Sequence, residues 1–333
     1  MQIRISVVIP AYNIAFWLPR CVDSLLLQTH ENLEIIIVND GSTDATGAII
    51  DSYAARDPRI KAIHKENGGV SSARLRGIAE ATGQWIGFVD GDDFVDPEMF
   101  SRLLNNALVH RADISHCGYQ MVFPDGHVDF YYNSSRLITQ THDQGLIDLI
   151  QGKFVEPGLV NKLFRRDLFH NLSDWTDPSI RNNEDLLMNF FLFRQAKCAV
   201  YEDICPYHYM LRKGSATTSR LNSHKLWDPF RVAQRLFDEA PVAAKSAALE
   251  KLARILINGA AMSLQDQAEL IRPYRQEARK SLRRLLGNII SEKNISIKVK
   301  IMSLWAAIWP WSYGAVHRLY SRITGLDKKY ELS

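Results

Sequence analysis

Three aspartates stand within the segment Asp90-Gly91-Asp92-Asp93, directly after a hydrophobic run. Carboxylates this close repel one another, so a cation is their natural partner. Carboxylate oxygens suit Mg²⁺ or Mn²⁺, which commonly bind a protein carboxylate together with substrate phosphates. An acidic turn ahead of the next helix would use the same residue types, so the motif alone leaves both interpretations open.

A second polar segment, Asn39-Asp40-Gly41-Ser42, also follows a hydrophobic run. Glycine and asparagine give the backbone the freedom that tight turns need, so the segment by itself favours a turn. The functional alternative is that the Asp40 carboxylate accepts a hydrogen bond from an N–H group of a nucleotide base.

No glycine-rich phosphate loop follows the first hydrophobic run, where the segment Pro10-Ala11-Tyr12-Asn13 stands instead. Neither GxGxxG nor GxxxxGK[ST] occurs in the chain, which disfavours a dinucleotide site or a P-loop. A phosphate group would then be held by a metal ion and by basic side chains. Arg74 and Arg76 are candidates for this role, and a solvated helix face is the alternative for both.

These polar segments lie in an alternation of strands and helices that must position them. Short β-branched runs predict buried strands, and apolar residues at helical spacing predict helices between them. This order predicts a parallel sheet with helices on both faces, whose ligands bind outside the carboxyl ends of the strands. The polar loops should therefore share one sheet edge. The predicted strands are residues 5–9, 34–38, 60–64 and 85–89, and the predicted helices are residues 17–27, 45–55 and 69–81.

The pattern changes after the first hundred residues. A helix is predicted from Pro97 to about residue 110, and the segments 114–123 and 128–132 are β-rich around a turn at 124–126. A further helix is predicted over 184–195, and the chain is helical from about residue 221. The sequence thus predicts two domains, residues 1–220 and residues 221–333.

Four ordered segments together resemble the family 2 glycosyltransferases, which are inverting enzymes of the GT-A fold. The resemblance is strong over residues 4–100, continues more weakly through 161–166, 183–185 and 207–209, and lapses beyond about residue 220. It implies an α/β fold of the GT-A type, Rossmann-like with a mostly parallel central sheet, here with a C-terminal helical extension. The four segments are Val7-Val8-Ile9-Pro10-Ala11-Tyr12-Asn13, Ile37-Val38-Asn39-Asp40-Gly41-Ser42-Thr43-Asp44, Glu66-Asn67-Gly68-Gly69-Val70-Ser71-Ser72-Ala73-Arg74 and Phe88-Val89-Asp90-Gly91-Asp92-Asp93.

The resemblance also implies site residues and a reaction. Asp90 would bind the ribose, Asp92 would bind a Mn²⁺ or Mg²⁺ ion that bridges the diphosphate, and Asp185 would be the catalytic base. Ala11, Tyr12 and Asp40 would hold the base of the nucleotide. This chain has Leu75 where the family often has an asparagine after the arginine. The full set expected to bind the nucleotide is Pro10, Ala11, Tyr12, Asn13, Asp40, Asn67, Arg74, Asp90 and Gly91.

Two of the implied roles have simpler alternatives. Asp185 begins a predicted helix, where a negative charge complements the helix dipole whatever the chemistry. His208 lies between Tyr207 and Tyr209; some metal-dependent GT-A enzymes use a late histidine as an additional metal ligand, but a packed histidine is the alternative. Arg212, with Lys213 and Ser215 beyond, is a weak candidate for a segment that closes over the diphosphate.

The resemblance thus predicts transfer of a sugar from a nucleotide diphosphate, with UDP-sugar as the expected donor, to an acceptor hydroxyl. The expected acceptor is a glycan or lipid-linked glycan of bacterial surface polysaccharide synthesis. A sugar-nucleotide nucleotidyltransferase is one alternative, although that class usually opens with a glycine-rich loop that contains arginine. A non-catalytic relative that binds nucleotide sugars is another, and a glycoside hydrolase needs no nucleotide pocket.

Composition limits the remaining classes. A net charge of +3 and 23% charged residues do not indicate nucleic acid as a partner. The four cysteines form no CxxC pair, which argues against a zinc site and fits a reducing compartment. No stretch approaches the roughly 20 apolar residues of a membrane-spanning helix, and the first apolar run is too short for a signal peptide. A cytoplasmic protein is therefore expected.

The C-terminal part of the chain is basic and carries apolar stripes. Residues 269–333 contain 13 Lys and Arg against 5 Asp and Glu, whereas residues 1–268 contain 27 against 32. This pattern predicts a helix pair on the inner face of the cytoplasmic membrane, with a helical lid or a dimer contact as alternatives. One stripe is Ile301, Leu304, Trp305, Ile308 and Trp309, with Trp311 beyond; the other is Val316, Leu319, Tyr320 and Ile323, with Arg318 and Arg322 opposite; the flanking lysines are Lys293, Lys298 and Lys300.

Overall fold

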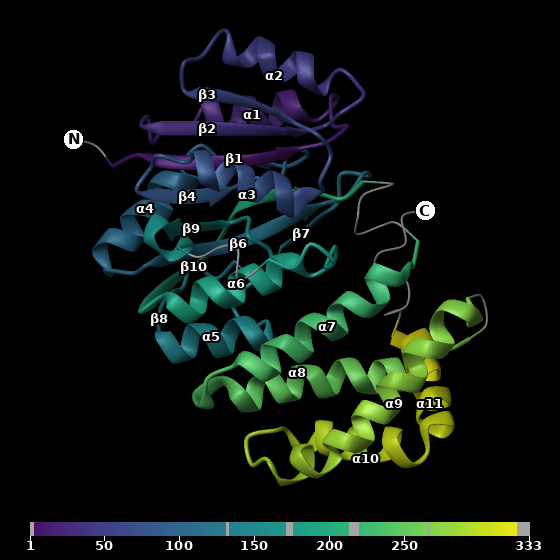
Figure 1. The fold of residues 1–333 in the computed structure, drawn as a ribbon. Helices are drawn as coiled ribbons and strands as arrows, with labels where there is room; N and C mark the ends of the chain where they lie inside the picture. Colours follow the sequence, from purple (N-terminus) through teal and green to yellow (C-terminus); the bar gives the residue numbers. More distant parts are fainter. Residues whose placement is uncertain (1–2, 131–132, 171–175, 213–219, 265–266, 325–333) are drawn as a thin grey trace. The chain divides into compact units, whose positions relative to one another are not determined.

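The computed structural model describes residues 3–130, 133–170, 176–212, 220–264 and 267–324 (Figure 1). The chain divides into two compact units, Met1–Leu211 and Arg212–Ser333. The boundary predicted after residue 220 stays a prediction, because residues 213–219 lie outside the described chain. Lys213 and Ser215 of the suggested closing segment lie in the same gap.

The first unit is built on a ten-stranded mixed sheet with the strand order β3-β2-β1-β4-β9-β6-β10-β5, while β7 pairs with β6 and β8 pairs with β10. Its first half is parallel, as the sequence predicts: β1 pairs with β2 and β4, and β2 pairs with β3. These strands are β1 (Ile5–Ala11), β2 (Leu33–Asp40), β3 (Ile60–Lys65) and β4 (Trp85–Phe88).

Side chains of β2 alternate between the two faces of the sheet, which explains why the whole run is apolar. Ile35 and Ile37 pack into a large core with α1 (Leu18–Leu26), α2 (Thr46–Ala54) and α4 (Met99–Val109). Ile36 and Val38 pack on the other side with Ala73 of α3 (Val70–Glu80). Helices therefore cover both faces, and the predicted α/β fold is confirmed.

Helix α3 lies unusually close to β1 because Gly77 faces the sheet. A Cβ atom at Gly77 would come within 2.3 Å of the Val8 Cγ1 atom, so any larger residue would push the helix away. This close approach brings the preceding turn of α3, which carries Arg74, down toward the carboxyl end of β1. Arg74 is consequently buried, with 3% of its surface exposed.

The second half of the sheet contains strands that the sequence analysis did not predict. β9 (Lys162–Arg165) runs antiparallel between β4 and β6 (Ile114–Val122), and the long strand β10 (Cys198–Met210) runs parallel to β6. The β10 register shifts between Glu202 and Tyr207, where Pro206 cannot donate a ladder hydrogen bond. The remaining elements are β5 (Phe94–Val95), β7 (Val128–Phe130), β8 (Leu137–Thr141), α5 (His142–Gln151), the short 3₁₀ helix Arg166–Phe169 and α6 (Glu184–Gln195).

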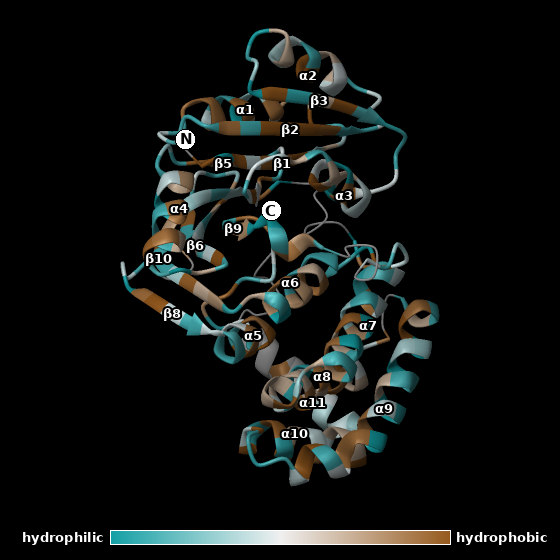
Figure 2. Cartoon of the chain, turned by 60° about the vertical axis from the view of Figure 1, so that its left-hand side comes forward, coloured by the Kyte–Doolittle hydropathy of each residue, from teal (hydrophilic) through white to brown (hydrophobic). Residues whose placement is uncertain are grey.

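The second unit is helical, as predicted from residue 221 onward. Its core is a cluster of leucine, isoleucine and alanine side chains between the helices, and the hydropathy colours in Figure 2 show the banding of each helix. The helices are α7 (Ser223–Glu239), α8 (Val242–Ala261), α9 (Ala268–Ser291), α10 (Ile297–Ile308) and α11 (Pro310–Thr324). Among the described residues, no helix is long and apolar enough to cross a membrane.

Candidate active site

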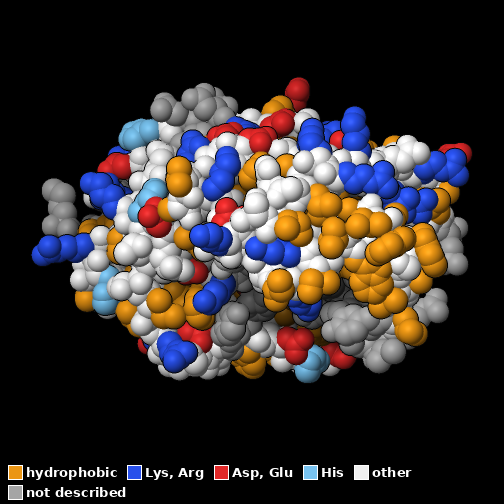
Figure 3. All heavy atoms as spheres, turned by 90° about the horizontal axis from the view of Figure 1, so that it is seen from below, with side chains coloured by type: hydrophobic (Ala, Val, Ile, Leu, Met, Phe, Trp, Pro, Cys, Tyr) orange, Lys and Arg blue, Asp and Glu red, His pale blue; other side chains and the backbone are white. Residues whose placement is uncertain are grey.

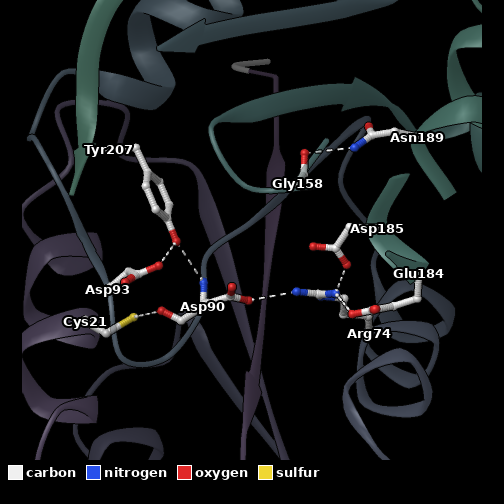
Figure 4. Close-up of polar contacts among 9 residues, drawn as sticks. All are labelled: Cys21, Arg74, Asp90, Asp93, Gly158, Glu184, Asp185, Asn189 and Tyr207. Carbon is white, nitrogen blue, oxygen red and sulfur yellow. Dashed lines mark hydrogen bonds and ion pairs between the residues drawn. The ribbon is translucent and has the colours of Figure 1, made fainter. Parts of the chain in front are cut away.

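The buried guanidinium of Arg74 joins three acidic side chains from two other parts of the fold (Figure 4). Its Nη2 group donates to Asp90 Oδ1 at 3.0 Å, and its Nη1 group donates to Asp185 Oδ1. Nη1 also lies 3.5 Å from Glu184 Oε1. Burial alone would lower the pKa of Arg74, but Asp185, Asp90 and Glu184 raise it above its usual value, so this residue is permanently charged.

Asp185 and Glu184 reach Arg74 because they are the first two residues of α6, which begins beside the guanidinium. The residue before the helix, Asn183, has a left-handed backbone with φ of 65°, and the helix then runs to Gln195 as predicted. Burial, followed by the neighbouring charge of Asp185, raises the pKa of Glu184 to about 8. Glu184 therefore holds a proton more readily than an ordinary glutamate, and the hydrogen bonds of Arg74 go to Asp90 and Asp185.

Two of the three aspartates that follow β4 have different hydrogen-bond partners. Asp90 meets Arg74, whereas Asp93 is buried and accepts hydrogen bonds from the Tyr207 hydroxyl at 2.6 Å and the Met210 N–H at 2.8 Å. The same Tyr207 oxygen accepts a bond from the Asp90 N–H at 3.2 Å. Loss of hydration, together with the neighbouring aspartates, raises the pKa of both Asp90 and Asp93, while Arg74 acts to lower that of Asp90.

Gly91 allows this loop to lie against the end of β1. A Cβ atom at Gly91 would come within 2.4 Å of Ile14 Cδ1 and 3.2 Å of the Pro10 carbonyl oxygen. The predicted nucleotide-binding residues Pro10 and Gly91 are thus neighbours. Their contact gives Gly91 a role in packing the loop, in addition to its predicted role in nucleotide binding.

A metal ion was predicted at Asp92. No group of three or more His, Cys, Asp or Glu side chains among the described residues is arranged to hold a metal ion. Tyr207 donates to the Asp93 carboxylate and Arg74 donates to the Asp90 carboxylate, and Asp92 lies between these two residues in the loop. One carboxylate with substrate phosphates is an ordinary site for Mg²⁺, and three aspartates within one short loop also fit a cation.

Asp40 is the most heavily hydrogen-bonded of the predicted base-binding residues. Its Oδ1 atom accepts from Lys65 Nζ at 2.6 Å and from the Gly68 N–H at 3.0 Å, and its Oδ2 atom accepts from the Gly69 N–H at 2.8 Å. Asn67 donates to the Asp40 carbonyl at 2.9 Å. Asp40 and Asn67 therefore join the loops after β2 and β3 at the predicted edge.

The loop after β1 joins the same edge. Asn13 accepts a hydrogen bond from the Thr43 N–H at 2.8 Å, and its own N–H donates to Ser42 Oγ at 3.1 Å. Ala11 is buried, while half of the Tyr12 surface is exposed beside it. The structure thus brings the predicted nucleotide-binding residues together at the carboxyl ends of four parallel strands, and their individual roles stay predictions.

His208 lies among groups other than the Asp92 carboxylate. Its Nε2 atom is 2.7 Å from Asp96 Oδ1 and 3.2 Å from Gln120 Nε2, and its ring stacks on Phe94 at 4.0 Å. These contacts describe the packed histidine that was the alternative to a metal ligand. Arg76 similarly pairs with Glu80 on an exposed face of α3, at 2.8 Å.

The sequence analysis missed a group of buried residues beside Asp185. Asn189, one turn further along α6, donates to the carbonyls of Pro157 and Gly158 at 2.7 and 2.8 Å. Lys162 also donates to the Gly158 carbonyl, at 2.7 Å, and burial lowers its pKa to about 8. A Cβ atom at Gly158 would stand 4.0 Å from Asp185 Oδ2, so this segment forms a fixed wall next to the candidate base.

Comparison with known proteins decides the family. The model of "Glycosyl transferase family 2" matches residues 6–173, which include all four loops at the sheet edge. The chain is a family 2 glycosyltransferase. The predicted resemblance is thereby confirmed, and the match includes Gly158 and β9 and ends before Asp185.

Two curated relatives of this glycosyltransferase come from Bacillus subtilis (strain 168). It is 38% identical to the uncharacterized glycosyltransferase EpsJ over 216 residues, which is 64% of this chain and 62% of EpsJ. It is 33% identical to the putative glycosyltransferase EpsH over 214 residues, which is 63% of this chain and 62% of EpsH. The alignment therefore spans less than two thirds of either relative.

Solved structures of TarS from S. aureus confirm the GT-A fold of this glycosyltransferase. Residues 1–349 of TarS in complex with UDP give a TM-score of 0.67 at 18% identity, covering 96% of this chain and 91% of that one. The complex of the same part of TarS with UDP-GlcNAc also gives 0.67, at 19% identity. At this identity the likeness concerns the fold.

Proposed function

We propose that this glycosyltransferase moves a sugar from a UDP-sugar to an acceptor hydroxyl with inversion at the anomeric carbon. Asp185 acts as the base that takes the proton of the hydroxyl, and the loops after β1 to β4 bind the nucleotide. The observation that carries the proposal is the position of Arg74, which contacts Asp90 of the nucleotide loop and Asp185 of α6. The proposed base and the loop proposed to bind the nucleotide are thus next to each other.

The charges around Arg74 support a base at Asp185. The raised pKa of Glu184 favours its protonated form, and Arg74 places a buried positive charge against the Asp185 carboxyl group. Arg74 holds its Oδ1 atom, and Oδ2 lies toward Gly158. A general base must be held within hydrogen-bond reach of the proton it removes, and these contacts fix the orientation of the carboxylate.

We propose Asp92 as the protein ligand of a Mn²⁺ or Mg²⁺ ion that arrives with the donor. Such an ion would neutralise the charge of the departing diphosphate as a Lewis acid. The presence of three carboxylates, those of Asp90, Asp92 and Asp93, in one short loop supports a cation as their partner. His208 is left out of the proposed metal site because Asp96 and Gln120 contact its ring.

UDP as the nucleotide is supported by the TarS complexes with UDP and UDP-GlcNAc, which share the fold. As the acceptor we propose a glycan or lipid-linked glycan of cell-surface polysaccharide synthesis, which the family resemblance implies. Gly158 and its neighbours lie beside the proposed base, and we propose that they line the acceptor side of the site.

Calorimetric titration with UDP, with and without Mn²⁺, tests the nucleotide and the metal together. We expect binding that requires Mn²⁺ and that tightens for one member of a panel of UDP-sugars. The product formed from that donor should have the opposite anomeric configuration, as seen by NMR. Release of pyrophosphate from UTP and a sugar phosphate would instead support a nucleotidyltransferase, and tight UDP binding without turnover would support a non-catalytic relative.

A further inference from the structure

Helix α10 is apolar on two opposite sides, and only one side is used inside the helical unit. Val299, Ser303, Ala306 and Ala307 are buried in its core. Ile297, Ile301, Leu304 and Ile308 repeat at helical spacing on the other side and are exposed, with Ile297 at 73%. A helix that is hydrophobic all round normally has both sides covered, so this second side lacks its partner.

The exposed apolar surface continues across the turn into α11. Trp309 and Trp311 are exposed by 57% and 75%, and Val316 and Leu319 follow along α11. Trp305 differs from the prediction, because it faces inward: its Nε1 group donates to Ser312 Oγ at 2.9 Å, and its ring packs edge-on against Tyr313. The side chains of Tyr320 and Ile323, and of Arg318 and Arg322 opposite them, lie outside the described residues.

We name this surface the α10–α11 face, defined by Ile297, Ile301, Leu304, Ile308, Trp309, Trp311, Val316 and Leu319. Figure 3 shows hydrophobic side chains gathered in one area beside several lysines and arginines.

The segment that forms this face carries charged residues of one sign only, while Glu250 and Glu292 lie beside the start of α10. Residues 293–324 contain five Lys and Arg and no Asp or Glu. On the neighbouring helix α9, the Arg283 Nε group donates to the Ala307 carbonyl at the end of α10, at 3.1 Å. Burial lowers the pKa of Arg279, and the positive charges of the nearby Arg275 and Arg283 lower it further. These arginines form no ion pair with any described acid.

From this combination we infer that the α10–α11 face binds the surface of an anionic lipid bilayer. Exposed isoleucine and leucine side chains would enter the acyl boundary, tryptophans would lie at the level of the headgroups, and the basic residues would meet anionic headgroups. A second copy of the chain fits less well, because a two-fold contact would bring two positively charged surfaces together. The inference does not depend on the proposed reaction.

The test is co-sedimentation of the full chain with vesicles of phosphatidylcholine that contain phosphatidylglycerol, compared with vesicles of phosphatidylcholine alone. We expect binding to the anionic vesicles that falls as salt is added. The double variant Ile301→Glu with Ile308→Glu should lower the affinity by at least about tenfold, because it places two charges in the apolar stripe. Val242→Glu is the matched control: Val242 begins α8 in the same unit, is 93% exposed and lies outside the face.

A second measurement keeps the inference testable if the double variant fails to fold. In the unmodified chain, vesicles with brominated acyl chains should quench the fluorescence of Trp309 and Trp311, and Trp309→Phe with Trp311→Phe should remove most of that quenching. Absence of binding to anionic vesicles would overturn the inference. So would binding that is equal for both vesicle types and for both charge variants, or a dimer in sedimentation velocity that the double variant dissociates.

Discussion

The Asp185 carboxylate accepts a hydrogen bond from the buried guanidinium of Arg74, so the first turn of α6 is tied to the sheet-facing side of α3. The same guanidinium binds Asp90 after β4. One cation thereby holds the candidate base and the nucleotide loop in a common arrangement.

Asp185→Asn should abolish most of the transfer while sparing affinity for UDP. The amide cannot take a proton, and removing a general base costs about 10²- to 10⁴-fold in rate. The measurement is the rate of UDP release with acceptor, together with UDP titration by calorimetry. Glu184→Gln on the same turn is the matched control and should keep much more of the activity. Equal losses of turnover and UDP affinity in Asp185→Asn would contradict its role as base.

Asp92→Asn should weaken the binding of UDP in the presence of Mn²⁺ and leave the weak binding without metal unchanged. A neutral amide is a poorer ligand for a hard divalent ion, and an effect of about tenfold or more is expected. Asp125→Asn, in the exposed turn between β6 and β7, controls for the loss of one negative charge. An unaltered dependence on Mn²⁺ would rule out Asp92 as the metal ligand.

Arg74→Lys should lower both stability and transfer. The three N–H groups of an ammonium sit on one nitrogen, whereas Arg74 reaches Asp185 and Asp90 with two separate nitrogens, so a buried carboxylate loses its partner at a cost of about 1–3 kcal/mol. Urea unfolding measures the first effect and turnover the second. Arg76→Lys, on the exposed face of the same helix, should change neither by a comparable amount. If the two variants behaved alike, Arg74 would not be the organising cation.

Glu184→Gln should become more stabilising as the pH rises. The pKa of Glu184 is raised in the folded state from 4.5 to about 8, so between these values the folded protein binds more protons than the unfolded chain. Its contribution to stability therefore falls as pH rises through this window. At pH 8.5 the variant should exceed the unmodified protein by about 1–2 kcal/mol in free energy of unfolding, with a smaller difference at pH 5. A variant that is less stable at pH 8.5 would show that an ionised Glu184 pairs favourably with Arg74.

His116 should make the first unit sensitive to acid. Burial, followed by the charge of Lys162, lowers its pKa from 6.5 to about 3. Its Nε2 atom lies 2.8 Å from Gln140 Oε1, and its Nδ1 atom has no hydrogen-bond partner among the described residues. Because the unfolded chain binds a proton first, this residue's contribution to stability is present above pH 6.5 and is lost as pH falls toward 3.

At pH 4.5 the contribution of His116 to the free energy of unfolding should be smaller than at pH 7 by about 2 kcal/mol. Urea unfolding of the unmodified protein and of His116→Asn at both pH values separates this residue from the carboxylates that titrate below pH 5. His127→Asn in the exposed turn is the control. The same loss between pH 7 and pH 4.5 in His116→Asn would mean that His116 contributes nothing.

The sequence by itself determined the parallel half of the sheet and the position of its polar loops. β-branched runs such as Ile35–Val38 specify strands locally, and the rule that parallel strands end at one edge places Ala11, Asp40 and Asp90 together. The start of α6 at Glu184 was also predicted correctly, because apolar spacing and acidic first-turn residues are local signals.

Only the tertiary structure decided which side chains meet. Several acids stand near the predicted site, and nothing local tells which one Arg74 binds, why Asp93 turns to Tyr207, or that Asn189 and Lys162 hold the wall beside Asp185. Strands β9 and β10 were missed for the same reason, since their pairing joins segments that are distant in the chain. The inward turn of Trp305 follows from contacts with Ser312 and Tyr313. Hydrophobic period and turn chemistry act over a few residues, whereas these choices depend on distances that exist only once the elements have packed.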